Sequence, residues 1–214
     1  MIIYIPIKQN SQRVPNKNFR LFNGKPLWEH TVDKFSDPKY KLFIDTDSEE
    51  IIDQCHSKNV TAFKRPTHLR GDTVSVVDLL KNFREFLSKL SLSGNICQIH
   101  VTSPFLDITH VDFAFSKMEN DGYDSVFAAD VMQTRFWRKE EYGYCPVNHN
   151  PMKLEQTQDL PKYYCENSYL YAFQQNVLDI NNRIGYNPYI LEVGYPHNLD
   201  IDTESDWNYI KNIK

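Results

Sequence analysis

Short apolar runs alternate along the chain with segments of helical period, and this alternation limits the folds open to the sequence. Residues 2–7 (IIYIPI) form a continuous apolar run, which is typical of a strand buried on both faces. Runs of similar character occur at 41–46, 60–63, 95–101, 124–129, 168–173 and 188–193. Because alternating strands and helices are joined by right-handed crossovers, we expect an α/β fold with a mainly parallel sheet covered by helices.

Helical periodicity is clearest over residues 73–90. The apolar positions recur at spacings of four and three and so share one helix face: Val76, Leu80, Phe83, Leu87 and Leu90. Asp72 or Thr73 is the predicted N-cap, since both side chains can accept a hydrogen bond from the first turn. Further helices are expected over 48–58 and after Ser205.

The alternation breaks at residues 131–166, a polar stretch that contains several prolines. Its aromatic residues are nonetheless dense: Phe136, Trp137, Tyr142, Tyr144, Tyr163 and Tyr164. A structureless loop of this length is uncommon inside a domain, and clustered exposed aromatics usually become buried. We therefore predict an arm or hairpin that packs on a partner subunit, with a lid over the chain's own site as the alternative. Residues 1–214, arm included, are expected to form one domain.

Charge is unevenly distributed along the chain. The net charge is −4, from 24 basic and 28 acidic residues, which argues against a nucleic-acid or membrane-surface partner. Five of the bases and no acid lie in residues 1–28, so the other 19 bases share residues 29–214 with all 28 acids. A cationic N-terminal segment on an anionic body predicts a local anion site.

The cysteines and the apolar segments bear on the compartment. None of the cysteines has the spacing of a zinc site, so all are expected to be free thiols: Cys55, Cys97, Cys145 and Cys165. No segment approaches the ~20 consecutive apolar residues that span a bilayer, and the N-terminal run is too short for a signal peptide. We therefore expect a soluble, cytoplasmic protein with no membrane partner.

The loop after the first strand, residues 8–18, has the chemistry of an anion site. Ligands of open α/β sheets bind beyond the carboxyl ends of the strands. The loop lacks GxGxxG and GxxxxGK[ST], and the chain has only 7 glycines, which disfavours an NAD-dependent oxidoreductase and a Walker-type site. A triphosphate needs both cations and neutral donors around it. The loop offers both: Lys8, Arg13 and Lys17 as cations, with Asn10, Ser11, Gln12 and Asn18 as neutral groups. A basic loop that is merely solvated is the alternative for residues 8–18.

The second signal is the acidic segment 198–206 (NLDIDTESD). Asp200 and Asp202 alternate across Ile201, so in an extended segment their carboxylates point to the same side. Two such oxygen ligands suit a Mg²⁺ that retains waters and bridges phosphates, whereas a solvated turn or helix cap is the alternative for this motif alone. The acidic segment and the cationic loop together favour a nucleotide site.

Motifs along nearly the whole chain resemble those of the CMP-sialic acid synthetases, or acylneuraminate cytidylyltransferases. In order they are IPIKQNSQRVPNKN (5–18), NGKPLWEHT (23–31), IDTDSEEI (44–51), RPTHLRGDT (65–73), TSPFL (102–106), QDLPKYYCENSYLYAF (158–173) and LDIDTESDW (199–207). The resemblance implies a Rossmann-like nucleotidyltransferase fold and a homodimer whose exchanged arm, matching 131–166, reaches the neighbouring sugar site. It also implies Mg²⁺-dependent transfer of CMP from CTP to the anomeric hydroxyl of an acidic 2-keto sugar, sialic acid or a related nonulosonic acid, with release of pyrophosphate.

The resemblance and the residue patterns together assign roles to individual side chains. The predicted catalytic residues are Lys8, Lys17 and Asp202. The predicted nucleotide-binding set is Lys8, Asn10, Ser11, Arg13, Lys17, Asn18, Arg65 and Asp72. The predicted sugar-binding set is His100, Thr102, Ser103, Gln158, Asn167 and Tyr171. Mg²⁺ is expected at Asp200 and Asp202.

Departures from the family pattern concern the sugar more than the chemistry. Lys8 replaces an arginine, and Gln12 stands where a lysine is usual. His100 replaces a glutamine that contacts the sugar, although a packing histidine at a strand end is its alternative role, and Ser168 replaces a glycine. The loop at 11–15 also resembles that of the CMP-Kdo synthetases, which are the alternative within this class. A non-catalytic module that binds CTP or the sugar is the alternative outside it.

Overall fold

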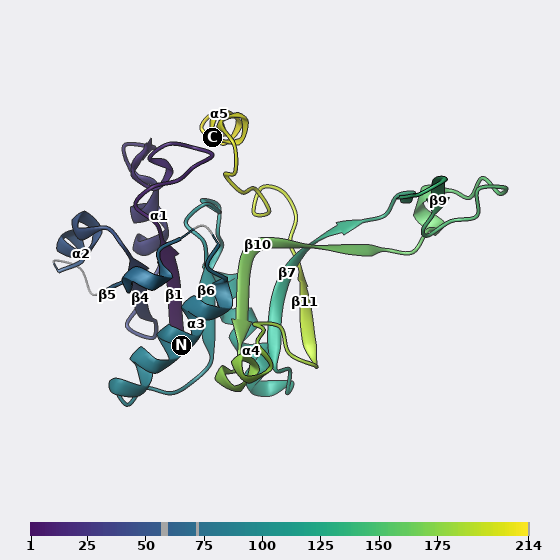
Figure 1. Ribbon diagram of the computed structural model, residues 1–214. Helices are drawn as coiled ribbons and strands as arrows, with labels where there is room; N and C mark the ends of the chain where they lie inside the picture. Colours follow the sequence, from purple (N-terminus) through teal and green to yellow (C-terminus); the bar gives the residue numbers. More distant parts are fainter. Residues whose placement is uncertain (57–59, 72, 214) are drawn as a thin grey trace.

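A seven-stranded sheet lies at the centre of the computed structural model, which describes residues 1–56, 60–71 and 73–213 (Figure 1). The strand order is β11-β7-β10-β6-β1-β4-β5. Strand β1 pairs in parallel with β4 and β6, β4 with β5, and β11 with β7. Strand β10 runs antiparallel to both of its neighbours. The prediction of a mainly parallel sheet is confirmed, with β10 as its exception.

The strands of this sheet follow the apolar runs of the sequence. Their bounds are β1 Ile2–Ile7, β4 Lys41–Thr46, β5 Thr61–Lys64, β6 Ile96–Ile99, β7 Ser125–Met132, β10 Tyr163–Phe173 and β11 Pro188–Glu192. Strands β7 and β10 extend beyond the predicted 124–129 and 168–173. Their pairing with each other continues past the other strands of the sheet, as far as Tyr163 opposite Met132.

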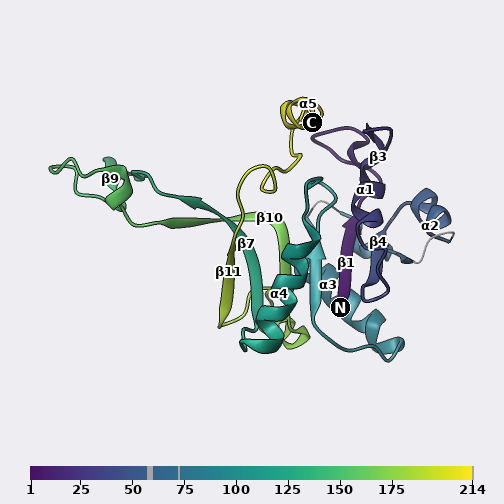
Figure 2. The ribbon, with the colours of Figure 1, turned by 180° about the vertical axis from the view of Figure 1, so that it is seen from behind.

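Helices cover both faces of the sheet. They are α1 Leu27–Asp33, α2 Glu49–Cys55, α3 Val76–Lys89, α4 Ile108–Asn120 and α5 Glu204–Ile210, with short 3₁₀ segments η1 Lys17–Phe19, η2 Thr67–Leu69, η3 Thr157–Asp159 and η4 Gln175–Ile180. Helices α1, α2 and α4 pack their apolar side chains in one cluster with Ile3 and Ile5 of β1 (Figure 2). Helix α3 packs on the opposite face with Tyr4 of the same strand. The hairpin of β2 Leu21–Phe22 and β3 Lys25–Pro26 precedes α1.

The N-cap of α3 differs from the sequence prediction. Ser75 occupies this position, and its hydroxyl accepts a hydrogen bond from the Asp78 backbone N–H at 3.1 Å. Thr73 therefore lies outside the helix, and Asp72 lies outside the described residues. Serine, threonine and aspartate are all good caps, so composition alone does not select among neighbouring candidates.

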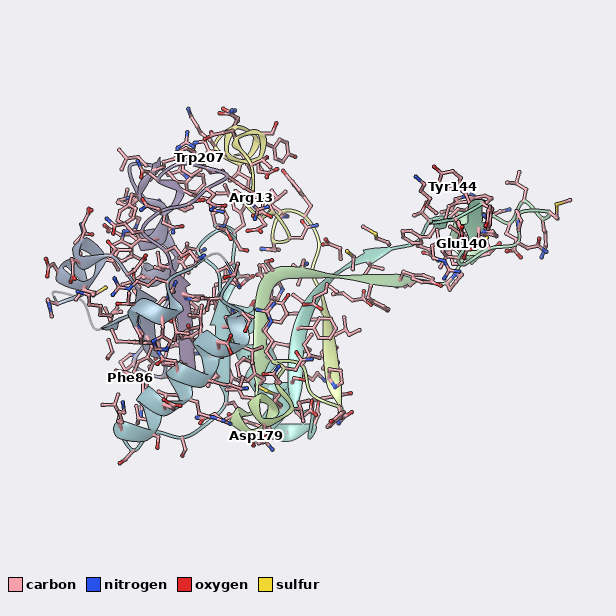
Figure 3. The ribbon with its side chains drawn as sticks, viewed as in Figure 1. Arg13, Phe86, Glu140, Tyr144, Asp179 and Trp207 are labelled. Atoms are coloured by element: carbon pink, nitrogen blue, oxygen red, sulfur yellow. The ribbon has the colours of Figure 1, made fainter. Side chains whose placement is uncertain are left out.

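An arm projects from the body where β7 and β10 leave the sheet as a two-stranded ribbon (Figure 1). Near its far end, where Figure 3 labels Glu140 and Tyr144, β8 Trp137–Glu140 pairs with β9 Gly143–Pro146. Trp137 and Tyr144 are exposed in the single chain, by 52% and 68%. An arm thus stands at the predicted place, while its burial by a partner subunit stays a prediction.

The cysteines carry free thiols, as predicted. Cys55 and Cys97 are buried, Cys145 is half-buried and Cys165 is exposed. Within residues 1–56, 60–71 and 73–213, no helix is long and apolar enough to cross a membrane. A cytoplasmic location stays a prediction.

The cap of α3 can be tested by replacing Ser75 with alanine. The variant loses the acceptor for the Asp78 N–H, so its free energy of unfolding should fall by about 1 kcal/mol. Urea denaturation measures this change, with Thr73→Ala as the matched control that should alter stability by less than about 0.5 kcal/mol. If Thr73→Ala lowered the free energy of unfolding more than Ser75→Ala, the assignment of Ser75 as the N-cap would be wrong.

Candidate active site

A cleft of about 480 Å³ lies beyond the carboxyl ends of β1, β5 and β6. This is the edge at which open α/β sheets bind their ligands. Among the residues that line it are most of the predicted nucleotide-binding set and two of the predicted sugar-binding set: Lys8, Asn10, Ser11, Arg13, Lys17, Asn18, Arg65, His100 and Thr102. The structure therefore brings together side chains that the sequence analysis selected from distant segments.

The loop between β1 and η1 is held in shape by its own hydrogen bonds. The Asn18 amide donates to the Lys8 carbonyl at 2.8 Å, and the Lys17 backbone N–H donates to the Val14 carbonyl at 3.1 Å. Val14 is fully buried and anchors the middle of the loop, whereas the neighbouring Arg13 side chain is 67% exposed. The apolar anchor and the backbone turns thus fix a loop whose cations are presented to the cleft.

The cationic loop meets the acidic segment directly. Arg13 Nη2 donates to Asp202 Oδ1 at 2.7 Å, and Lys17 Nζ lies 3.9 Å from the same oxygen (Figure 3 labels Arg13). Lys17 also donates to the Ile201 carbonyl, and the Ile201 N–H donates to the Thr102 carbonyl at 2.9 Å. These contacts join the two segments that the sequence analysis placed in one nucleotide site.

Asp200 is a carboxylate whose pKa is shifted by its surroundings. Its Oδ1 is buried and has no hydrogen-bond partner among the described residues, while the side chain accepts a hydrogen bond from Thr102. Burial raises the pKa of Asp200, the nearby Asp202 raises it further, and Lys17 opposes this shift. A buried, unpartnered carboxylate oxygen beside a second carboxylate is costly unless a cation binds there.

The donor set at this point fits Mg²⁺ better than a metal that requires many protein ligands. No cluster of three or more His, Cys, Asp or Glu side chains that could ligate a metal occurs in the part of the chain that the structure describes. Mg²⁺ keeps several waters and commonly binds through one or two carboxylates together with substrate phosphates. Asp200 and Asp202 would therefore hold Mg²⁺ only together with a phosphate ligand.

Arg65 lies buried in the floor of the cleft and is fixed by Asp45. Its Nε donates to Asp45 Oδ1 at 2.9 Å, and its Nη2 donates to the Asp45 carbonyl at 2.9 Å. The second Asp45 oxygen accepts a hydrogen bond from the Tyr4 hydroxyl at 2.6 Å. Arg65 was predicted from the sequence, whereas Asp45 and Tyr4 were not. An aspartate inside an apolar strand is a signal that a buried charge is paired.

His100 joins a polar cluster that the sequence analysis also missed. Its Nε2 lies 2.8 Å from the amide nitrogen of Gln98, and the Gln98 oxygen accepts a hydrogen bond from Arg183 at 3.0 Å. Burial lowers the pKa of His100 to about 4, with further contributions from the positive charges of Arg183 and Lys17. His100 is therefore neutral at pH 7. A glutamine inside the apolar run at 95–101 is the sequence signal that could have revealed this cluster, because a buried amide needs hydrogen-bond partners.

The other residues predicted to bind the sugar lie outside the described lining of this cleft. Ser103 is buried, and the Asn167 amide donates to Asp130 at 3.3 Å. Tyr171 is buried, and its hydroxyl donates to Glu166 at 2.7 Å. Gln158 is exposed in η3 on the arm and does not belong to the lining of its own chain's cleft. A role for Gln158 toward the sugar stays a prediction.

The neutral state of His100 predicts a loss of stability in acid. Its folded pKa of about 4 lies below the usual 6.5, so between these values the unfolded chain binds a proton that the folded chain does not. Stability should therefore fall as the pH drops through this window. In urea denaturation, the loss of stability between pH 7 and pH 5 should be smaller in His100→Gln than in wild type. Equal losses in wild type and His100→Gln would contradict this account.

Comparisons with known proteins place the chain in a family. A family model described as cytidylyltransferase matches residues 2–214. The chain is 28% identical over 203 residues to N-acylneuraminate cytidylyltransferase A of Danio rerio, covering 92% of this chain and 46% of that protein. It is 26% identical over 217 residues to pseudaminic acid cytidylyltransferase of Campylobacter jejuni, covering 97% and 93%. The chain thus spans about half the length of the N-acylneuraminate cytidylyltransferases it matches.

A solved structure supports the same placement at the level of the fold. CMP:2-keto-3-deoxy-manno-octonic acid synthetase complexed with CTP matches with a TM-score of 0.67 at 14% identity, covering 98% of this chain and 96% of that one. A likeness at this identity shows the fold alone, and it confirms the expected Rossmann-like nucleotidyltransferase fold. The family match over almost all of the sequence confirms the resemblance drawn from the motifs. The chain belongs to the cytidylyltransferase family.

Proposed function

We propose that this protein transfers CMP from CTP to the anomeric hydroxyl of an acidic 2-keto sugar and releases pyrophosphate. The observation that carries the proposal is the convergence of Arg13 and Lys17 with Asp200 and Asp202 at one cleft. The family supports the cytidylyl part of this activity, and the names of the two relatives support a nonulosonic acid as the acceptor.

The triphosphate of CTP is the ligand that the cationic loop would bind. Lys8, Arg13 and Lys17 supply positive charge, while Asn10 and Ser11 supply neutral hydrogen-bonding groups in the same cleft. Catalysis of phosphoryl-type transfer depends mainly on positioning and charge neutralisation. The anomeric hydroxyl gives its proton to water or to a phosphate oxygen as its oxygen forms a bond to the α-phosphorus. The bond from that phosphorus to the leaving pyrophosphate breaks, and the cations stabilise the charge on the leaving group.

Mg²⁺ is the cofactor we propose for this reaction, held by Asp200 and Asp202. When bound, the ion would neutralise phosphate charge and polarise the α-phosphate. The unpartnered oxygen of Asp200 and the proximity of Asp202 support this assignment. Arg13, which pairs with Asp202 in the ligand-free cleft, would then be available to bind oxygens of the triphosphate.

A homodimer is the assembly we propose, with the arm contacting the partner subunit. The support is chemical: the arm exposes Trp137, Tyr142 and Tyr144 by 52%, 94% and 68%, and such a concentration of exposed aromatic surface favours association. Gln158 lies on the same arm and away from the cleft of its own chain. Contact between the arm and a second chain would place Gln158 at the sugar site of that chain.

The proposed reaction can be tested with CTP, Mg²⁺ and a panel of acidic sugars that includes N-acetylneuraminic acid, pseudaminic acid and Kdo. Pyrophosphate release should require a nonulosonic acid and should fall on the order of 10²-fold or more in Asp202→Asn, which loses a charge next to Lys17. Asp179→Asn is the matched control, because Asp179 pairs with Arg84 outside the cleft lining. Release with Kdo alone would identify the alternative acceptor. CTP binding without release for any sugar would refute the enzymatic proposal.

The proposed dimer can be tested by multi-angle light scattering. Wild type should have twice the chain mass, and replacing Trp137, Tyr142 and Tyr144 by serine should shift the equilibrium toward the monomer. Tyr186→Ser is the control, since Tyr186 is 87% exposed but lies outside the arm. A fully active wild-type monomer would refute the proposed assembly.

A further inference from the structure

Three polar side chains form a hydrogen-bonded chain that leads from Arg183, which is half-buried, to the cleft. Arg183 Nη1 donates to Gln98 Oε1 at 3.0 Å, and Gln98 Nε2 lies 2.8 Å from His100 Nε2. Gln98 is fully buried in β6, and the Arg183 side chain is only 17% exposed. His100 follows β6 and lines the cleft. The chain thus links the cleft to a charged group that does not line it.

The donor and acceptor chemistry of this chain allows only one assignment of protons. A guanidinium has donors and no acceptor, so Gln98 must turn its oxygen toward Arg183. The Gln98 NH₂ group then faces His100, and the His100 Nε2 must accept the hydrogen bond. The single proton of a neutral imidazole is therefore on Nδ1.

The surroundings hold Arg183 in place as the fixed end of the chain. The guanidinium carbon lies 3.3 Å from the centre of the Tyr171 ring, a close stacking contact. The Tyr171 hydroxyl donates to Glu166 at 2.7 Å, and Arg183 Nη2 lies 3.9 Å from the same Glu166 oxygen. Arg183 is thus fixed by a ring and by a carboxylate, and it keeps its charge next to Gln98.

The charged groups around His100 act in the same direction. Arg183 and Lys17 both oppose its protonation, in addition to the effect of burial. The Nε2 lone pair is already engaged by a buried amide, so it does not face a substrate hydroxyl. The remaining polar atom of the ring is Nδ1, which can only donate.

We propose that Arg183 is a positioning residue that, through Gln98, fixes His100 as the neutral Nδ1–H tautomer. In this state His100 donates a hydrogen bond to an oxygen of the acidic acceptor sugar and does not accept the proton of the attacking hydroxyl. The identity of the ligand rests on the proposed function, whereas the tautomer does not. Tyr171, predicted from the family resemblance to contact the sugar, here acts as the platform on which Arg183 stacks.

The tautomer can be measured without any substrate. In protein labelled with ¹⁵N-histidine, long-range ¹H–¹⁵N correlation at pH 7 should show His100 protonated at Nδ1 and unprotonated at Nε2. Arg183→Gln removes the donor-only constraint, so Gln98 can rotate and the Nε2–H form should appear. Arg84→Gln is the matched control, because Arg84 is an ion-paired arginine on α3 that lies outside the cleft lining.

Two results of this measurement would overturn the proposal. One is an Nε2–H or doubly protonated His100 in the wild-type protein, which requires no variant and so does not depend on how Arg183→Gln folds. The other is an unchanged His100 tautomer in a folded Arg183→Gln protein, which would show that Arg183 does not set it.

Kinetics test the role toward the sugar separately. His100→Gln retains an N–H donor, so kcat/KM for the acceptor should stay within about tenfold of wild type, whereas His100→Leu should lose more than about tenfold with little change in KM for CTP. If His100 were a general base, His100→Gln and His100→Leu should instead be equally inactive. If no sugar supports turnover, the proposed function fails while the tautomer measurement still decides the role of Arg183.

Discussion

The candidate site depends on the burial of one residue, Ile201. Its side chain is fully buried, its N–H donates to the Thr102 carbonyl, and its carbonyl accepts a hydrogen bond from Lys17. These contacts attach the acidic segment, nearly at the end of the described chain, to the loop after β1 and to the segment after β6. Apolar burial thus fixes the backbone between two aspartates, and the carboxylates on either side are brought to the cations.

The electrostatics of the cleft suit a ligand that brings both negative charge and a cation. Arg13 and Lys17 neutralise Asp202, but Asp200 keeps a buried oxygen without a hydrogen bond in the described part of the chain. Burial lowers the pKa of Lys17, while Asp200 and Asp202 counteract that shift. The two aspartates thus favour the charged form of Lys17, and part of the cost of burying Asp200 is left for a ligand to offset.

Much of the fold, and several of the segments that line the cleft, could be predicted from local sequence. Continuous apolar runs located the strands, and the spacing of Leu80, Phe83 and Leu87 located the buried face of α3. Leu90, predicted on the same face, is the C-cap and is 46% exposed, because periodicity does not show where a helix ends. The reversed direction of β10 also escaped prediction, since it depends on which strands become neighbours.

The residues that sequence reasoning missed share a physical cause. Gln98 and Arg183 are 85 positions apart, and their significance arises only when β6 and the loop after η4 come together. Asp45 could have been suspected from its place in an apolar strand, but its partners Tyr4 and Arg65 are likewise set by tertiary packing. Ion pairs and amide orientations are therefore far less visible in a sequence than strands.

A neutral, donating His100 has a consequence for how the acceptor hydroxyl would lose its proton. The described lining of the cleft contains cations and neutral donors, and its only imidazole has its Nε2 lone pair engaged by Gln98. In the proposed reaction, such a site would favour deprotonation by stabilising the alkoxide through Lys17, and a cation held by Asp200 and Asp202 would add positive charge. The proton would then pass to water or to a phosphate oxygen of the ligand. Charge neutralisation by the side chains of the cleft would then take the place of a general base at His100.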